Sequence, residues 1–302
     1  MTFLKRFVFL LVVLVLPVTS FAQNTPAIQS GKTASVETLN ASVTLDLKLA
    51  SKLMGREMPY RVILPKNYEV HKTEKFAVIY LLHGLTGHFD NWTDKTKLKD
   101  YSTNYNYIIV MPEGSDGWYS DSATVPNDKY ESYLMEELIP EIDKNYRTFG
   151  DRQHRAVAGL SMGGYGSLKF GLKYSDKFIL VGSFSGALGV ASWTDKTLGN
   201  GWKALTDSIM SVYGAEESQT RKDNDIYKIA REITPEKVQL LPFMYLDCGT
   251  EDGLIQQNRD FNAILIEKKI PHEFRELPGK HDWKFWDSQV LEFLQVTEKF
   301  LK

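Results

Sequence analysis

The residues best suited to chemistry lie in the segment 158–166, which reads AGLSMGGYG and places Ser161 at the centre of Gly-x-Ser-x-Gly. A strand-like stretch (155–158) precedes this motif and a helix-like stretch (167–174) follows it. In a nucleophile elbow the chain turns sharply from strand to helix, and the serine hydroxyl is exposed on a strained backbone. The flanking glycines let strand and helix approach closely. The motif therefore indicates a nucleophilic serine; the alternative is a glycine-rich turn with an incidental serine.

A nucleophilic serine needs a base to accept its proton and a carboxylate to orient that base. In one known arrangement the acid and then the histidine follow the serine along the chain. Only His272 and His281 follow Ser161. His272 lies in the alternating segment 270–275, which is typical of a strand, and we interpret it as structural. His281 lies in a Pro/Gly loop (277–283) before the last helix, and we predict that it is the base.

The acid is expected in the loop after the apolar run 243–246, where the sequence reads DCGTEDG. Asp247 lies within or at the edge of the strand, where a structural hydrogen bond is expected. Asp252 lies at the loop tip, where its side chain can turn toward the histidine, and we predict that it is the acid. Glu251 is expected to point elsewhere and to cap the next helix. Asp282 adjoins the predicted base in sequence, so their side chains diverge, and we interpret it as a helix cap.

Acyl transfer also needs backbone donors at the point where the oxyanion develops. One donor is expected to be the amide after the nucleophile, Met162, at the start of a helix. The other is expected in the loop that follows the run 76–82, which begins with His83 and Gly84. We predict Leu85 N–H as this donor, with Gly84 as the alternative, and interpret His83 as a hydrogen-bonding scaffold.

The elements that must position these residues alternate between apolar runs and amphipathic segments. Strands buried on both faces are predicted at 76–82, 107–111, 178–181 and 243–246. Amphipathic helices are predicted at 130–146, 255–268 and 283–301. The segments 42–48 and 60–64 indicate an antiparallel N-terminal edge. This pattern predicts an α/β fold with a mostly parallel central sheet and helices on both faces, in which ligands bind at the carboxyl ends of the strands.

The N-terminal segment 1–22 is typical of a secretory signal peptide. Lys5 and Arg6 precede ten apolar residues, 7–16, and a small-x-small site ends at Ala22. Ten apolar residues are about half of the ~20 that cross a bilayer, so we expect cleavage near Ala22 and export, with no stable membrane span. An uncleaved membrane anchor is the alternative.

After a polar leader (23–40) expected to be flexible, the sequence predicts one domain over 41–302. The segment 191–232 interrupts the alternation, and we interpret it as an insertion over the site; an ordinary long connection with two surface helices is the alternative. A net charge of −2 without a long basic run argues against nucleic-acid binding. The single cysteine, Cys248, excludes an intrachain disulfide, and no metal-ligand spacing occurs, so neither a metal nor another cofactor is expected.

Beyond the serine motif, the chain resembles the esterase D-like branch of the α/β hydrolases. This branch includes tributyrin and feruloyl esterases, S-formylglutathione hydrolases and mycolyltransferases. The resemblance covers about 43–301 and rests on the segments 60–65, 80–84, 111–114, 118–119, 137–140, 146–148, 249–252 and 281–283. It implies an α/β-hydrolase fold, a triad of Ser161, Asp252 and His281, and oxyanion amides at Leu85 and Met162. The signal peptide departs from the S-formylglutathione hydrolases, which are cytosolic.

Aromatic residues near the predicted site suggest a substrate class. Trp118 and Tyr119 follow the run 107–111, and Trp283 follows the predicted base. Their rings could stack on a phenolic acyl group or a sugar, although packing beneath the loops is the alternative. Together with export, they suggest an esterase that removes feruloyl or acetyl groups from carbohydrates, or that cleaves short-chain acyl esters. No partner other than such a substrate is indicated.

Three functional classes fit these residues. A serine carboxylic-ester hydrolase that forms an acyl-enzyme is the prediction. An acyltransferase of the mycolyltransferase type, with the same triad, is the alternative, because a sugar hydroxyl can replace water in deacylation. A catalytically silent binding module on the same fold is the third class, and the complete set of triad candidates argues against it.

Overall fold

A computed structural model describes residues 42–198 and 202–301, which form one compact unit. The predicted signal peptide (1–22) and leader (23–40) lie outside the described residues. Within the described ranges, no helix has the length and apolar character needed to cross a membrane.

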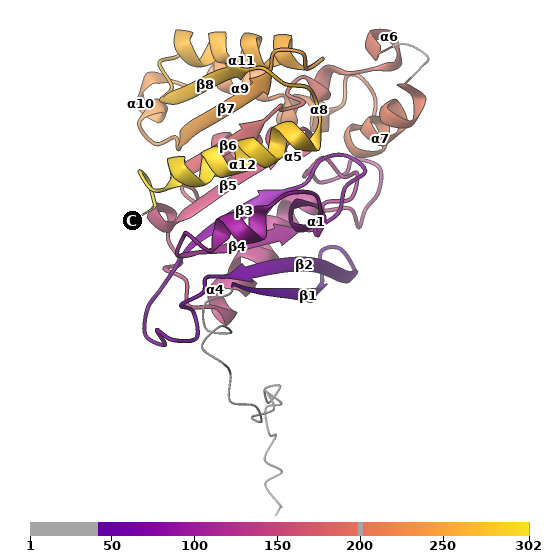
Figure 1. Cartoon of the computed structure of the whole chain (residues 1–302). Coiled ribbons are helices and arrows are strands. Elements are labelled where there is room, and N and C mark those ends of the chain that lie inside the picture. Colours follow the sequence, from indigo (N-terminus) through magenta and orange to yellow (C-terminus); the bar gives the residue numbers. More distant parts are fainter. Residues whose placement is uncertain (1–41, 199–201, 302) are drawn as a thin grey trace, which may run out of the picture. The chain divides into compact units, whose positions relative to one another are not determined.

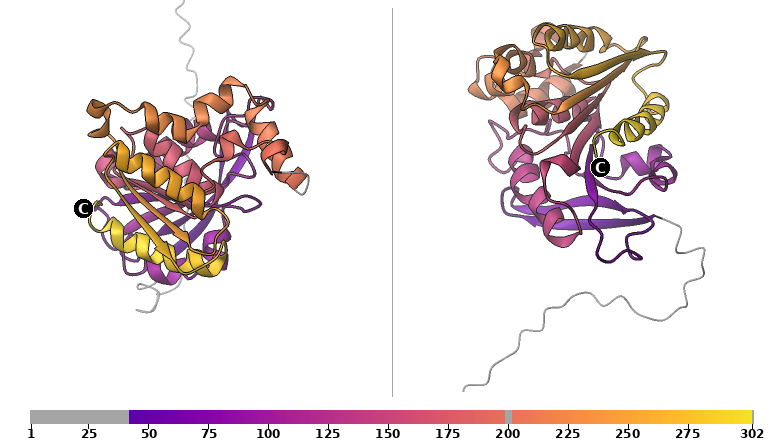
Figure 2. Two further views of the ribbon diagram at one scale, coloured as in Figure 1. Left: turned by 90° about the horizontal axis from the view of Figure 1, so that it is seen from above. Right: turned by 90° about the vertical axis from the view of Figure 1, so that its left-hand side faces the viewer.

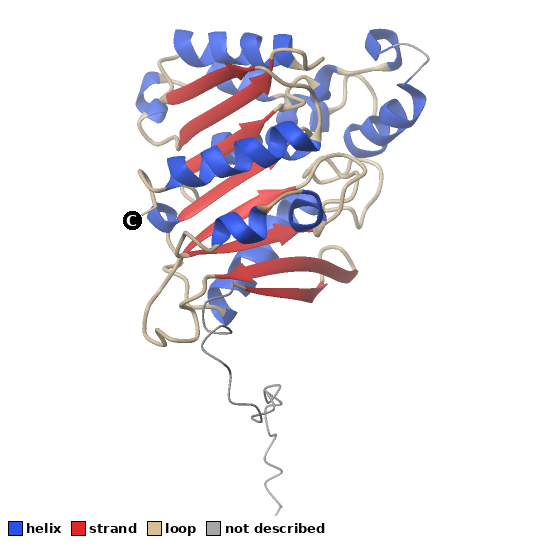
Figure 3. Cartoon of the chain, in the orientation of Figure 1, coloured by secondary structure: helices blue, strands red, loops and turns tan. Residues whose placement is uncertain are grey.

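An eight-stranded sheet forms the centre of the unit (Figures 1 and 3). Its strands, in spatial order, are β1 (Val43–Ser51), β2 (Arg56–Leu64), β4 (Tyr107–Pro112), β3 (Ala77–Leu82), β5 (Arg155–Leu160), β6 (Leu180–Phe184), β7 (Phe243–Gly249) and β8 (His272–Leu277). The β1–β2 and β2–β4 pairs are antiparallel, and all other pairs are parallel. The predicted fold class, including its antiparallel N-terminal edge, is confirmed.

Helices cover both faces of this sheet (Figure 2). The longer helices are α4 (Ile139–Asn145), α5 (Met162–Lys173), α7 (Lys203–Tyr213), α9 (Ile226–Glu232), α11 (Ile255–Glu267) and α12 (Trp283–Thr297). The shorter helices are α1 (Asn91–Lys95), α2 (Leu98–Ser102), α3 (Tyr130–Ser132), α6 (Asp195–Leu198), α8 (Gln219–Asn224) and α10 (Pro235–Val238). A π-helical stretch, η2 (Tyr133–Leu138), joins α3 to α4, and the 3₁₀ turns are η3 (Arg152–His154) and η4 (Val190–Ser192). The helix predicted at 130–146 is therefore continuous but contains a π-turn.

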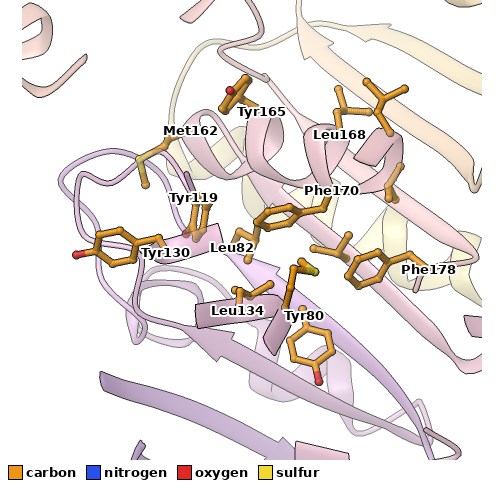
Figure 4. Close-up of a cluster of buried hydrophobic side chains, with 14 of the residues drawn as sticks. Tyr80, Leu82, Tyr119, Tyr130, Leu134, Met162, Tyr165, Leu168, Phe170 and Phe178 are labelled. Carbon is orange, nitrogen blue, oxygen red and sulfur yellow. The ribbon is translucent and has the colours of Figure 1, made fainter. Parts of the chain in front are cut away.

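The burial of the strands explains why they read as unbroken apolar runs. Every residue of β3 and of β5 is buried. Successive side chains point to opposite faces, so one face packs against α4, α5 and α11, and the other against α1, α2 and α12. Figure 4 shows part of the first layer, where Leu82 of β3 lies beside Phe170 of α5. With both faces covered, the open edge for ligands is the carboxyl end of the strands.

The described part of the segment 191–232 forms helices beside this carboxyl end and is anchored by a buried arginine. Arg221 is 3% exposed, and its guanidinium donates to the carbonyl oxygens of Ala191 (2.9 Å), Trp193 (3.0 Å) and Gly214 (3.1 Å). A buried guanidinium requires such acceptors because an unpaired buried charge is costly. These bonds tie separate turns of the segment together.

Candidate active site

The turn from β5 into α5 has the geometry of a nucleophile elbow. Ser161 has φ 51° and ψ −113°, a strained conformation for a residue with a side chain. Its N–H donates to Phe184 O at 2.9 Å. The flanking glycines are sterically required: a Cβ on Gly159 would lie 2.6 Å from the backbone of Gly163, and one on Gly163 would lie 2.5 Å from Leu82 O. The elbow therefore places the serine at the end of a central strand.

Three side chains from separate loops meet at this elbow. His281 Nε2 lies 3.0 Å from Ser161 Oγ, and His281 Nδ1 lies 2.8 Å from Asp252 Oδ2. Asp252 follows β7 and His281 follows β8, so parallel strand order brings them together. His272 lies elsewhere, with Nε2 2.9 Å from Asn262 Oδ1. The structure thus joins the three residues that the sequence places in a triad, and His272 has a structural partner.

The environment of Asp252 keeps its carboxylate ionised. Its side chain is fully buried, and burial alone raises its pKa. The hydrogen bond from His281, the charge of His281 and the Leu254 N–H together outweigh this effect, and the pKa of Asp252 is lowered below its usual value. Leu254 N–H donates to Oδ1 at 2.8 Å while His281 faces Oδ2. Each carboxylate oxygen therefore has one donor, and His281 is held with its Nδ1–H toward the acid.

Asp247 lies in a different environment from Asp252. β7 continues to Gly249, so Asp247 lies within the strand and is fully buried. Among the described residues, neither of its carboxyl oxygens has a hydrogen-bond partner, which corrects the expectation of a structural hydrogen bond. Burial raises the pKa of Asp247 well above its usual value. A carboxyl group that does not contact the histidine cannot orient it, and His281 Nδ1 faces Asp252 instead.

The other two acidic candidates have distinct roles. Asp282 accepts the Phe285 N–H at 3.0 Å and caps α12, as expected. Glu251 does not cap α11; its carboxylate lies 3.6 Å from Lys280 Nζ, and both side chains are largely exposed. The expected capping role of Glu251 is therefore wrong, because Leu254 separates it from the start of the helix.

Two backbone amides are available beside the serine. Within 42–198 and 202–301, neither Leu85 N–H nor Met162 N–H donates to a protein acceptor. Met162 is the first residue of α5, where amides have no partner within the helix. Gly84 O, in the same peptide plane as Leu85 N–H, accepts Gly87 N–H at 3.0 Å and lies 2.7 Å from His83 Nδ1. His83 is thus a buried scaffold, as interpreted from the sequence.

A cleft of about 630 Å³ opens over these groups. Ser161, Asp252 and His281 line it, together with Leu85 of the candidate oxyanion loop. Its aromatic lining residues are Trp118, Trp193, Trp202, Trp283 and Trp286. The Trp286 and His281 rings pack at right angles, with centroids 4.9 Å apart. The cleft is therefore mainly apolar, with a few polar groups at its centre, as is usual for small-molecule sites.

Of the three aromatic residues predicted to contact substrate, Trp118 and Trp283 line the cleft and Tyr119 does not. The side chain of Tyr119 is fully buried, and its hydroxyl donates to His83 O at 3.0 Å. Trp118 and Tyr119 both have positive φ, 50° and 49°. This backbone directs the Tyr119 ring into the core. The expectation that Tyr119 contacts substrate is therefore wrong.

Several lining residues were not identified by the sequence motifs. Asn91 and Lys95 come from α1, and Lys95 Nζ lies 5.7 Å from the centroid of the Trp283 ring. No local pattern marks these two residues, because only the packing of α1 against α12 brings them to the cleft. Trp193 and Trp202 belong to the segment 191–232, whose tryptophans were the one available signal.

Comparisons with known proteins agree with this fold. A family model described as "Putative esterase" matches residues 51–295, and the chain belongs to this esterase family. It is thus a carboxylic-ester hydrolase. An acetyl esterase of Caldicellulosiruptor saccharolyticus is 29% identical over 267 residues, covering 84% of this chain and 98% of that protein. An esterase of Mycobacterium tuberculosis is 32% identical over 251 residues, covering 78% of this chain and 54% of that protein.

Solved structures give the same classification. A ferulic acid esterase superposes with a TM-score of 0.74 and 28% identity, covering 87% of this chain and 99% of the other. The Mycobacterium tuberculosis protein MPT51 has a TM-score of 0.74 at 18% identity, covering 87% of this chain and 100% of the other, and shows the shared fold alone.

Proposed function

We propose that this esterase acts through an acyl-enzyme on Ser161, with His281 as general base and Asp252 as the residue that orients it. The observation that carries the proposal is the continuous hydrogen-bonded line from Asp252 Oδ2 through His281 to Ser161 Oγ, at 2.8 and 3.0 Å. These distances are within direct proton-transfer range. Because Asp252 accepts from Nδ1, Nε2 is left free to accept the serine proton.

In the first step Ser161 Oγ attacks the ester carbonyl and its proton passes to His281 Nε2. The negative charge that develops on the carbonyl oxygen is stabilised by the N–H groups of Leu85 and Met162. The C–O bond to the alcohol then breaks, and His281 returns the proton to the leaving oxygen. In the second step water attacks the acyl-enzyme while His281 accepts a proton from the water. The bond between the acyl carbon and Ser161 Oγ then breaks, and His281 returns the proton to Oγ, which releases the acid and restores Ser161.

For the substrate, we propose feruloyl or acetyl esters of carbohydrates, or short-chain acyl esters. Two observations support this choice: the aromatic lining of the cleft, and the names of two relatives, an acetyl esterase and a ferulic acid esterase. Planar rings stack favourably on tryptophan. The described part of 191–232 supplies Trp193 and Trp202 to one wall, and we propose that it is a fixed wall of the cleft.

A substrate panel tests this proposal: acetyl and butyryl esters, methyl ferulate and acetylated xylan. We expect turnover of the acetyl and feruloyl esters. Trp202 is 60% exposed on the cleft wall, so Trp202→Ala should lower kcat/KM for methyl ferulate about fivefold, since stacking contributes about 1 kcal/mol, and leave ethyl acetate hydrolysis unchanged.

The control for this variant is Leu240→Ala, because Leu240 is similarly exposed at 62% and does not line the cleft. Equal losses for both esters, or for both variants, would contradict a stacking role.

Adding an alcohol during turnover separates ester hydrolysis from acyl transfer, because an acyltransferase would form mainly the new ester. Hydrolysis as the main outcome is expected.

We also propose that the protein is exported after cleavage near Ala22. The support is the sequence of 1–22 alone, with its charged start and apolar run. We expect the mature protein recovered outside the cytoplasm of its host to begin at or near Gln23. Intact-mass measurement of that protein checks the prediction, and a full-length chain retained in the membrane would contradict it.

A further inference from the structure

The loop that carries Leu85 contains an unusual backbone conformation. Gly84 O accepts Gly87 N–H at 3.0 Å, which closes a four-residue turn with Leu85 and Thr86 at its centre. Thr86 has φ 59°, and a positive φ at the third position is the geometry of a type II turn. Glycine or asparagine usually occupies that position, and a β-branched residue is strained there. Something outside the turn must therefore stabilise this conformation.

The stabilising contact comes from the loop after β4. Asp116 Oδ1 accepts Thr86 N–H at 2.7 Å. This N–H belongs to the central peptide of the turn, the unit whose orientation distinguishes a type II turn from a type I turn. A carboxylate acceptor makes a strong, charge-assisted bond to a backbone amide. The Asp116 side chain thus favours the positive φ of Thr86 over the ordinary alternative.

The position of Asp116 is itself held by neighbours on both sides. On one side, Gly114 N–H donates to His83 Nε2 at 2.8 Å. On the other side, Ser208 Oγ of α7 donates to Asp116 O at 3.1 Å and accepts Trp118 Nε1–H at 3.1 Å. The loop after β4 is therefore connected both to the strand end that precedes the turn and to the helical segment that forms the cleft wall.

The direction of Leu85 N–H follows from this arrangement. In a trans peptide the C=O and N–H point in opposite directions. Gly84 O is held by Gly87 N–H and faces His83, so the Leu85 N–H in the same plane points away from both. A change of turn type would rotate the next peptide and loosen this alignment.

We propose that Asp116 is a positioning residue for the oxyanion donor Leu85, acting through the Thr86 N–H. The inference rests on the proposed function, because it requires Leu85 to stabilise the transition state. A positioning residue of this kind lowers kcat with little effect on KM, since the oxyanion forms only in the transition state.

The test compares Asp116→Ala with Asp116→Asn. We expect Asp116→Ala to lower kcat about 30-fold, less than the 10²–10³ typical for loss of an oxyanion donor, with KM within about threefold. A trifluoromethyl ketone, which forms an oxyanion-bearing adduct with a catalytic serine, should bind Asp116→Ala more weakly by a similar factor. Asp116→Asn retains an acceptor oxygen, so it should keep most of the activity.

A second variant addresses the backbone directly. Thr86→Gly removes the strain at φ 59°, so we expect it to restore much of the activity when added to Asp116→Ala. The matched control is Asp121→Ala, which removes a neighbouring carboxylate that accepts Ser132 N–H at 3.0 Å and does not touch the turn. It should leave kcat and ketone affinity unchanged.

The inference is overturned if Asp116→Ala leaves kcat within twofold, if Asp116→Asn is as impaired as Asp116→Ala, or if Thr86→Gly gives no rescue. Failure of the proposed function is seen separately. A wild-type protein that does not react with a fluorophosphonate at Ser161 would refute the serine mechanism itself, whereas normal wild-type reaction with an unaffected Asp116→Ala would refute only the positioning role.

Discussion

Ser161→Ala is expected to lower ester turnover by on the order of 10⁶-fold, the loss measured when other triad serines are removed. Without Oγ no acyl-enzyme can form, so the initial burst of product should disappear together with steady-state turnover. A fluorophosphonate should label the wild-type chain at Ser161 and leave Ser161→Ala unlabelled. Intact-mass spectrometry and burst-phase kinetics measure these two outcomes.

The variant should remain folded. Ser161 Oγ makes its one hydrogen bond among the described residues with His281, and alanine meets the same backbone strain at φ 51°. We expect the Tm to stay within about 4 °C of wild type. Ser192→Ala is the control, because Ser192 is an exposed serine whose hydroxyl donates only to Gly189 O. Retained turnover in Ser161→Ala, or labelling at another serine, would contradict the mechanism.

Much of this architecture could be predicted because its signals are local. Strands buried on both faces read as unbroken apolar runs, and the runs at 76–82 and 107–111 match β3 and β4 within a residue. The strand-turn-helix context of Ser161 is contained in adjacent residues. Parallel strand order then places the loops after β7 and β8 at the same edge of the sheet. Few residues in these loops can serve as the acid or the base, and Asp252 and His281 are among them.

What the sequence did not show depends on contacts between distant segments. Asp247 lies within β7, and the packing around the strand leaves both of its carboxyl oxygens without a hydrogen-bond partner among the described residues. The direction of Tyr119 depends on two successive positive φ values, which no residue type there signals. Asp116 acts on a turn 30 residues away, through one hydrogen bond to Thr86. Side-chain direction and long-range pairing were thus the limits of sequence reasoning.

Asp252→Asn is expected to lower kcat about 10⁴-fold, as in other triads that lose this carboxylate. The two oxygens of Asp252 have separate donors, Leu254 N–H at 2.8 Å and His281 Nδ1 at 2.8 Å. Asparagine has one acceptor oxygen. If this oxygen stays on Leu254 N–H, the amide NH₂ faces Nδ1 and forces the ring proton onto Nε2. His281 can then no longer accept the Ser161 proton, and steady-state kinetics at neutral pH should show the loss in kcat.

Asp247→Asn is the matched control, since it makes the same chemical change on the same strand-and-loop segment. We expect turnover within about threefold of wild type, because Asp247 does not touch His281, whose Nδ1 faces Asp252. Its raised pKa means that the folded protein holds a proton that the unfolded chain releases above about pH 4. Folding stability therefore falls as pH rises, by about 1.4 kcal/mol per unit until the folded pKa is passed. Asparagine removes that dependence, so urea unfolding should show Asp247→Asn gaining on wild type as the pH rises above about 4. If Asp247→Asn lost most of its turnover while Asp252→Asn stayed active, Asp247 and not Asp252 would be the acid.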